Sequence, residues 1–306
     1  MGLRELTPWY VRMATKVVLS RVPVPYQAWR ALRLFAHGEM AQSAYAYRVF
    51  RQHFDASNFP RKAGGFVALE IGPGDGLLSA VIAAACGAAK SYLVDMGAYA
   101  TRDIRPYQEI AQLLSSEGLA APDLGGAQDL AEILRRCNAA YLTHGLASLR
   151  ELPSHSVDFA WSHAVLEHIR AREFAAGVNE LRRILATDGC VSHQIDLRDH
   201  LGGGLNNLRF PGHWWEAEWL ARSGFYTNRI RFGEMMRVFA AAGFSVERLV
   251  TSRFETLPLR RASLAAEFRS LSDEDLLVSG FHVVMRAPAA STEGVATRTT
   301  TSPARP

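Results

Sequence analysis

FVALEIGPGDG, residues 66–76, is the stretch of sequence that decides the fold. The run before the first glycine is apolar except for Glu70 and rich in β-forming residues, which predicts a buried strand. Gly72, Gly74 and Gly76 end that run abruptly. Because glycine adopts positive φ and has no Cβ, a ligand can approach the N–H groups of such a turn at the start of a helix. The alternative is a tight strand-to-helix connection without a ligand.

An acidic residue follows at a characteristic distance. Residues 91–94 predict a second strand that ends at Asp95, 19 positions after Gly76. That distance fits one helix and one strand of a βαβ unit. A carboxylate at this strand end can accept hydrogen bonds from both hydroxyls of a ribose. A solvated loop carboxylate is the alternative interpretation of Asp95.

The rest of the chain alternates strands with helical segments, which predicts an α/β fold with a Rossmann-like, doubly wound, seven-stranded sheet. A helix is expected over 174–185, closed by Asp188 and Gly189. The last strand is expected to be antiparallel, at or near the sheet edge. The expected strands are 66–71, 91–94, 139–143, 157–161, 190–195, 244–250 and 280–285.

Several polar segments fall at the carboxyl ends of these strands, where ligands of open α/β sheets bind. They are residues 72–76, Asp95, 143–145, Ser162 with His163, and Asp196. Their convergence on one edge predicts the functional site.

The predicted domains are an N-terminal helical cap (1–60), a main domain (61–286) and a disordered tail (287–306). Within the main domain, glycines and aromatic residues in 197–230 predict an insertion or lid after the fifth strand. The cap is expected to have helices within residues 8–50, interrupted at Pro23 and Pro25, and another over 45–54. It covers the site, or it rests on a membrane as a basic amphipathic surface.

Composition narrows the class of protein. The chain has 306 residues, 48% of them hydrophobic, and a net charge of +4, enough for one large domain with additions. The arginines form no dense basic block with interleaved aromatics, which disfavours nucleic acid binding. Cys86, Cys137 and Cys190 are widely spaced and suit buried, reduced thiols of a cytoplasmic protein. No apolar run is long enough to cross a bilayer, and the N-terminus lacks a continuous signal-peptide core.

Three motifs together resemble the class I S-adenosylmethionine-dependent methyltransferases: LEIGPGDG, the following Asp95, and SVDFAWSHAVLEHI at 156–169. Within that class, the chain resembles a bacterial, type 11-like methyltransferase domain. The resemblance covers about residues 64–196 and extends more loosely to 286. DLRDH (196–200), LNNLRF (205–210) and YTNRIRFGEM (226–235) are similar to bacterial methyltransferases, some of which belong to cell-surface polysaccharide pathways.

The resemblance implies a binding site for S-adenosylmethionine. Asp95 would bind the ribose hydroxyls, Met96 would lie against the adenine, and Ser162 and His163 would approach the methionine moiety. Many relatives have an acidic residue after the third strand, where this chain has Thr143-His144-Gly145; His144 or a backbone group would then recognise the adenine. The methionine part would be held by Glu70, Gly72, Pro73, Gly74, Asp75 and Gly76.

Transfer to a hydroxyl also needs a base, because the acceptor loses its proton as the new bond forms. The preferred candidates are Asp196 with His200, or His163. A metal is not expected, because Ala164 stands where related metal sites would have a carboxylate one turn before Glu167. Candidates for binding the acceptor are Arg198, Trp214, Trp215, Tyr226, Asn228 and Arg229.

The sequence therefore predicts a cytoplasmic enzyme that transfers a methyl group to a small polar acceptor, most simply to a hydroxyl oxygen. One alternative is an NAD(P)-dependent oxidoreductase, although its usual glycine spacing is GxGxxG and this chain has GxGxG. The other is a non-catalytic protein that binds S-adenosylmethionine.

Calorimetric titration separates the two cofactors. We expect S-adenosylmethionine to bind and NAD not to bind. Asp95→Ala should weaken S-adenosylmethionine binding about tenfold or more, through the lost ribose hydrogen bonds. Binding of NAD alone would contradict the methyltransferase interpretation, and an unchanged affinity in the variant would remove Asp95 from the site.

Overall fold

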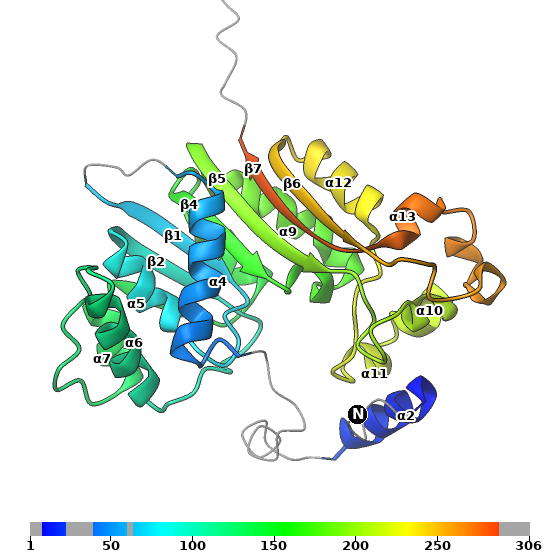
Figure 1. Cartoon of the computed structure of the whole chain (residues 1–306), viewed down its shortest axis with the longest axis horizontal. Helices are drawn as coiled ribbons and strands as arrows, with labels where there is room; N and C mark the ends of the chain where they lie inside the picture. Colours follow the sequence, from blue (N-terminus) through cyan, green and yellow to red (C-terminus); the bar gives the residue numbers. More distant parts are fainter. Residues whose placement is uncertain (1–7, 23–38, 60–63, 288–306) are drawn as a thin grey trace, which may run out of the picture.

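The computed structural model describes residues 8–22, 39–59 and 64–287, and its centre is a seven-stranded sheet in the order β3-β2-β1-β4-β5-β7-β6 (Figure 1). Strands β1 to β5 run parallel to their neighbours, and β7 lies antiparallel between β5 and β6. The predicted α/β class, the seven strands and the antiparallel strand near the edge are confirmed. The strands are β1 (Phe66–Ile71), β2 (Ala88–Val94), β3 (Ala139–Leu142), β4 (Val157–His163), β5 (Leu185–Asp196), β6 (Ser245–Arg253) and β7 (Val278–Arg286).

Helices cover both faces of the sheet, and a separate hydrophobic core lies between the sheet and each of the two helical layers. The central strands are buried along most of their length and largely apolar, as expected of a parallel sheet between two helical layers. One face carries α4 (Ser43–Ala56), α5 (Leu78–Ala85), α6 (Arg105–Ser116) and α7 (Leu130–Arg136), and the other carries α8 (Leu146–Glu151), α9 (Ala171–Ile184) and α12 (Phe232–Ala241).

Helix α4 packs directly on the sheet. Its buried residues recur at helical spacing and include Val49, Phe50, His53 and Phe54. The Phe50 ring meets the Trp161 ring of β4 edge to face, with their centroids 5.9 Å apart. Residues 43–56 therefore belong to the same core as β1 and β4, and they bring a histidine into it.

The part of the chain that follows β5 and precedes α12 forms a separate group of short helices. It contains the short helices η2 (Asn206–Arg209), α10 (Gly212–Trp215) and α11 (Glu218–Ala221), at the carboxyl ends of the strands. Its small core is formed by Leu201, Trp215, Leu220, Phe225 and Tyr226. The role of this segment as a lid stays a prediction.

Helix α2 (Trp9–Leu19) lies beside α10 and α11 and contributes partly buried Trp9, Met13 and Val17 to that core (Figure 1). The guanidinium of Arg12 donates to the Leu201 carbonyl at 3.2 Å. Helix α2 thus packs against the segment after β5, and its outer face exposes Tyr10, Val11 and Val18. Whether that face meets a membrane stays a prediction, as do the predicted domain boundaries.

The segment from β6 to β7 holds η3 (Arg261–Ser263), η4 (Ala266–Phe268) and α13 (Asp273–Leu277). It forms a small core with Leu205 and Leu208 of the segment after β5. The buried guanidinium of Arg229 joins the two segments, because it lies 5.3 Å from the Trp215 ring centroid and 5.0 Å from that of Phe268. Such contacts stabilise a desolvated cation.

The boundary between α9 and β5 differs from the sequence prediction. Helix α9 ends at Ile184 and β5 begins at once with Leu185, whereas the sequence predicted a turn at Asp188 and Gly189 before the strand. Leu185 is fully buried and pairs with Val157, so the strand starts early and contains a register irregularity. Tertiary pairing overrides the local turn signal here.

Some predictions fall outside the described residues. They concern Pro23, Pro25 and the apolar residues up to Phe35, together with the tail over 288–306. Ala287, which the sequence assigned to the tail, is described and buried in the core. Within the described ranges, none of the helices is both long and apolar enough to span a bilayer.

The last glycine of the turn has a packing role that can be tested. A Cβ on Gly76 would lie 2.5 Å from the Met40 carbonyl oxygen, whereas a Cβ on Gly177 of α9 would meet nothing within 4 Å. We expect Gly76→Ala to lower the free energy of unfolding by about 1–3 kcal/mol through overpacking. The matched control Gly177→Ala should raise it by about 0.5–1 kcal/mol. Urea denaturation measures both, and equal stability of the two variants would contradict the packing shown.

Candidate functional site

The glycine turn after β1 is bonded to the end of β2. Gly72 and Gly74 have φ of 73° and 67°, in the region that favours glycine. The Gly72 N–H donates to the Val94 carbonyl at 2.8 Å, and the Gly74 N–H donates to Oδ2 of Asp95 at 2.9 Å. Pro73 and Asp75 are buried within the turn. The turn is therefore held in one shape by the strand beside it.

Asp95 connects three strand ends. Its Oδ1 accepts the Met96 N–H at 2.7 Å, its own N–H donates to the Leu142 carbonyl, and its carbonyl accepts the Gly145 N–H at 2.8 Å. Met96 is 67% exposed, and its sulfur lies directly over the Gly145 backbone. Next to Gly145 stands the exposed His144. The structure thus brings Asp95, Met96 and His144 together beside the glycine turn.

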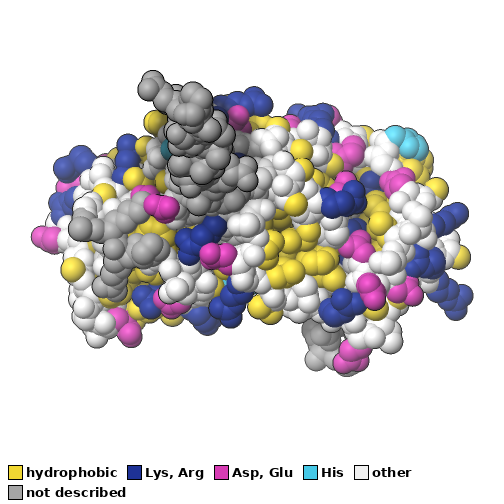
Figure 2. All heavy atoms as spheres, turned by 90° about the horizontal axis from the view of Figure 1, so that it is seen from above, with side chains coloured by type: hydrophobic (Ala, Val, Ile, Leu, Met, Phe, Trp, Pro, Cys, Tyr) yellow, Lys and Arg dark blue, Asp and Glu magenta, His cyan; other side chains and the backbone are white. Residues whose placement is uncertain are grey.

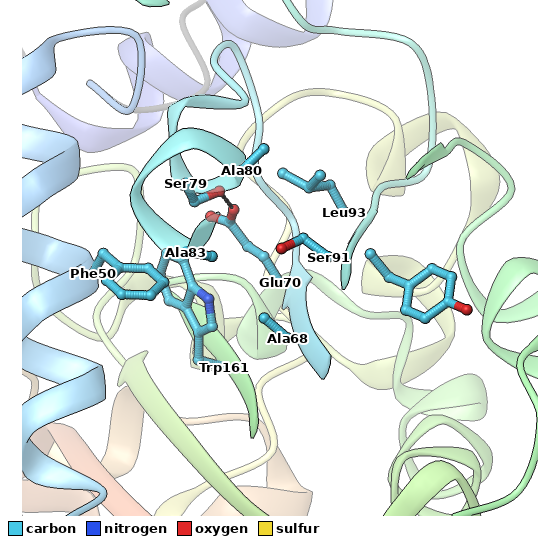
Figure 3. A pocket seen from close by; sticks show the side chains of 10 residues that line it. Phe50, Ala68, Glu70, Ser79, Ala80, Ala83, Ser91, Leu93 and Trp161 are labelled. Atoms are coloured by element: carbon cyan, nitrogen blue, oxygen red, sulfur yellow. Dashed lines mark hydrogen bonds between the residues drawn. The ribbon is translucent and has the colours of Figure 1, made fainter. Parts of the chain in front are cut away.

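Glu70 lies elsewhere. Its side chain is buried between β1 and α5, where it accepts a hydrogen bond from Ser79 beside a cavity of about 10 Å³ (Figure 3). That volume holds about one water molecule. Burial raises the pKa of Glu70 to about 8, against the lowering effect of the Ser79 hydrogen bond. The carboxyl points to Ser79 of α5, and Glu70 is only 4% exposed, so we expect any effect on a cofactor to pass through the backbone of β1.

The end of β4 sends two neighbouring side chains to opposite faces of the sheet. Ser162 is fully buried, and its Oγ lies 2.8 Å from Nδ1 of His193. His163 points to the α4 face, where its Nδ1 lies 3.2 Å from Nε2 of His53. Because Ile71 pairs with Ser162, His163 stands level with Gly72 across the sheet. Of the two, only His163 is half-exposed at this edge.

Asp196 and His200 are not hydrogen-bonded to each other. Both carboxylate oxygens of Asp196 accept from the Arg198 guanidinium, at 2.9 and 2.8 Å. Burial opposes these bonds, but their net effect lowers the Asp196 pKa. The exposed His200 instead lies against the His168 ring, with centroids 4.9 Å apart. The predicted pair thus consists of a carboxylate neutralised by arginine and a histidine on the surface.

Most residues suggested for acceptor binding are used within the protein. The Trp215 Nε1 donates to the Thr227 carbonyl, Tyr226 donates its hydroxyl proton to Glu216, and the Asn228 amide donates to the Leu166 and Ile169 carbonyls. The Trp215 and Tyr226 bonds hold the segment after β5 together, and the Asn228 bonds fasten it to the turn after β4. Trp214 is different, because 56% of it is exposed.

Sequence reasoning missed three residues that surround His163. They are His53 of α4, Ser192 of β5 and His282 of β7, all joined by hydrogen bonds on one face of the sheet. His53 was visible in principle, since it falls on the buried spacing of α4 between Phe50 and Phe54. Ser192 and His282 belong to strands whose contact depends on the sheet order, so no local signal identifies them.

The comparisons with known proteins concern the domain that contains these residues. A family model described as a methyltransferase domain matches residues 69–192, from within β1 to within β5. The chain carries a class I S-adenosylmethionine-dependent methyltransferase domain. The methyltransferase uses S-adenosylmethionine as its cofactor. The matched range contains the glycine turn, Asp95 and His163, and it excludes α4 and the segment after β5.

Among solved structures, the methyltransferase is similar to an S-adenosylmethionine-dependent methyltransferase from Mesorhizobium loti, with 17% identity, a TM-score of 0.42 and coverage of 79% of this chain and 95% of that one. For one from Methanosarcina mazei the values are 14%, 0.42, 77% and 98%. For phosphoethanolamine N-methyltransferase 2 of Haemonchus contortus they are 13%, 0.44, 83% and 54%. No curated protein matches the sequence.

The buried Glu70 gives the methyltransferase a pH-dependent stability. Between its ordinary pKa of 4.5 and the folded value of about 8, the native state holds a proton that the unfolded state releases. Stability contributed by that proton is complete below the lower value and falls as pH rises, at most about 1.4 kcal/mol per pH unit. Urea denaturation at about pH 5.5 and pH 8 should therefore show a smaller loss for Glu70→Gln than for the wild type. The exposed Glu109→Gln is the matched control; a loss in Glu70→Gln as large as in this control would contradict the assignment.

Proposed function

We propose that the methyltransferase transfers its methyl group to a hydroxyl oxygen of a small polar acceptor, with His163 as the base. The observation that carries the proposal is the position of His163. It is a half-exposed imidazole at the end of β4, level with Gly72 and held through Nδ1 by His53. Within the described ranges, Nε2 of this ring makes no hydrogen bond to protein and is left for an acceptor.

The residues at the strand ends fit the cofactor. The turn over 72–76 supplies backbone close to a ligand, because two of its glycines have positive φ. Asp95 supplies carboxylate oxygens for ribose hydroxyls, and the exposed Met96 supplies an apolar face for the adenine beside His144. We infer that Ser162 and Glu70 act on the cofactor indirectly, by fixing the backbones of β4 and β1.

When bound, S-adenosylmethionine supplies a methyl group already activated by a sulfonium, so alignment and proton removal remain for the protein. His163 can remove the proton, since burial lowers its pKa below 6.5 and leaves the ring neutral near pH 7. Asp196 is less suited because Arg198 stabilises its ionised form. His200 contacts the His168 ring at the surface, and among the described residues no hydrogen bond holds its own ring.

For the acceptor we propose a sugar or a similar hydroxyl-rich metabolite, of the kind used in cell-surface polysaccharide pathways, and we place the reaction in the cytoplasm. Exposed Trp214, in the segment after β5, offers a ring on which a sugar face can stack. The thiols of Cys137 and Cys190 are free and buried, which suits a protein of a reducing compartment.

The acceptor can be found by incubating the protein with methyl-labelled S-adenosylmethionine and a small-molecule extract of cells, followed by mass spectrometry of the labelled product. We expect an O-methylated product, formed at least about 100-fold more slowly by His163→Gln because base catalysis is lost. His155→Gln, at the opposite end of β4, is the control and should keep the wild-type rate. An N- or C-methylated product, or full activity of His163→Gln, would overturn the proposal.

A further inference from the structure

We propose that His163, His53, Ser192 and His282 form a proton relay that carries the acceptor's proton from the reaction centre to the outer part of the sheet. The inference rests on the proposed function, because it takes His163 as the base. It adds three residues that never meet the acceptor: His53 of α4, Ser192 of β5 and His282 of β7.

The chain of contacts is continuous. Nδ1 of His163 lies 3.2 Å from Nε2 of His53, and Nδ1 of His53 lies 2.8 Å from Oγ of Ser192. The same Oγ lies 2.8 Å from Nε2 of His282. Each distance suits a hydrogen bond, and the four side chains come from separate elements. Packing alone does not require this row of polar side chains, because apolar side chains would fill the same space without needing hydrogen-bond partners. A buried polar group that lacked a partner would cost stability.

The relay ends where the protein covering is thin. His282 is 9% exposed and pairs with Val250 of β6. Every residue of β6 is exposed, and β5, β7 and β6 lie beyond α4, which packs over β1 and β4 in Figure 1. The outer ring therefore keeps a small exposed area, whereas His53 and Ser192 are fully buried.

The tautomers of the relay follow from its hydrogen bonds. A neutral imidazole has one N–H donor and one acceptor nitrogen, and a serine hydroxyl can donate once and accept at the same time. If His163 is to accept a proton at Nε2, its hydrogen must be on Nδ1 and donate to His53. His53 then donates from Nδ1 to Ser192, and Ser192 donates to Nε2 of His282. All three rings thus carry hydrogen on Nδ1 in the resting enzyme.

Each methyl transfer moves one proton through this series of hydrogen bonds. The acceptor oxygen forms a bond to the methyl carbon, the carbon–sulfur bond breaks with its electron pair going to sulfur, and the hydroxyl proton moves to Nε2 of His163. Each donor in turn passes its hydrogen to the next acceptor, and His282 releases the Nδ1 hydrogen to water. The proton released balances the positive charge that the sulfonium loses. Each ring is left with its hydrogen on Nε2 instead of Nδ1. The resting tautomers return by proton exchange with water after the product leaves.

The charges around the relay favour neutral rings. His53 faces His163, His282 and, across the strand, His193, while His282 faces Arg248 of β6. His163 also meets the Tyr45 ring edge to face, with centroids 6.5 Å apart. Burial is the largest cause that lowers the pKa of each relay histidine, and for His282 it gives a value of about 4. Neutral rings can pass a proton along without storing it.

The tautomers can be measured on the full chain without an acceptor. Protein labelled with ¹⁵N in histidine, with signals assigned through single His→Gln variants, gives the tautomer of each ring from long-range ¹H–¹⁵N spectra near neutral pH. We expect hydrogen on Nδ1 in His163 and His53. A His163 ring with its hydrogen on Nε2 would overturn the relay, whatever product the enzyme makes.

The second measurement uses the acceptor identified from the extract. We expect Ser192→Ala to lower kcat at least about tenfold with little change in KM, and added imidazole to restore part of the rate. Ser192→Thr, which keeps the hydroxyl, should act like the wild type. The control Ser91→Ala removes a serine that is equally buried in β2 and should not change kcat. Equal kcat in Ser192→Ala and Ser91→Ala would overturn the relay, whereas an N- or C-methylated product with the expected tautomers would overturn the proposed function instead.

Discussion

One carboxylate, that of Asp95, holds the functional edge of the sheet together. It accepts the N–H groups of Gly74 and Met96, while its own backbone bonds to Leu142 and Gly145. Hydrogen bonds to a charged group contribute about 1.5–3 kcal/mol each, more than neutral ones. The ends of β1, β2 and β3 therefore keep fixed relative positions. If the cofactor lies across these ends, as we propose, it meets a surface already arranged, and little ordering has to accompany its binding.

The neighbouring edge is organised by the alternation of side chains along β4. Successive residues of a strand point to opposite faces, so Ser162 is bonded to His193 under one helical layer and His163 to His53 under the other. Both faces therefore hold polar groups inside a largely apolar core. A buried network of this kind is acceptable only where its members satisfy one another, and the one on the α4 face does so through Ser192.

The sequence predicted the sheet well because parallel strands buried on both faces leave continuous apolar runs. It failed at the start of β5, where Asp188 and Gly189 look like the end of a helix but lie inside a strand that Leu185 begins. It also named Asn228 and Arg229 as candidates for acceptor binding, which stays a prediction; in the structure they join the segment after β5 to its surroundings. A polar residue near a site gives the same local signal whether it binds a ligand or a carbonyl of its own chain.

The sequence by itself determined the class of fold, the cofactor and the residues at the strand ends, because the glycine spacing, Asp95 and the apolar periodicity are local properties of the chain. Only the tertiary structure decided which partners each candidate base has. It pairs Asp196 with Arg198, puts His200 on the surface, and joins His163 to His53, 110 positions earlier in the chain. The physical reason is that hydrogen-bond partners of a buried group are set by the strand order and by the helix packed over it, and neither is written in the neighbouring residues.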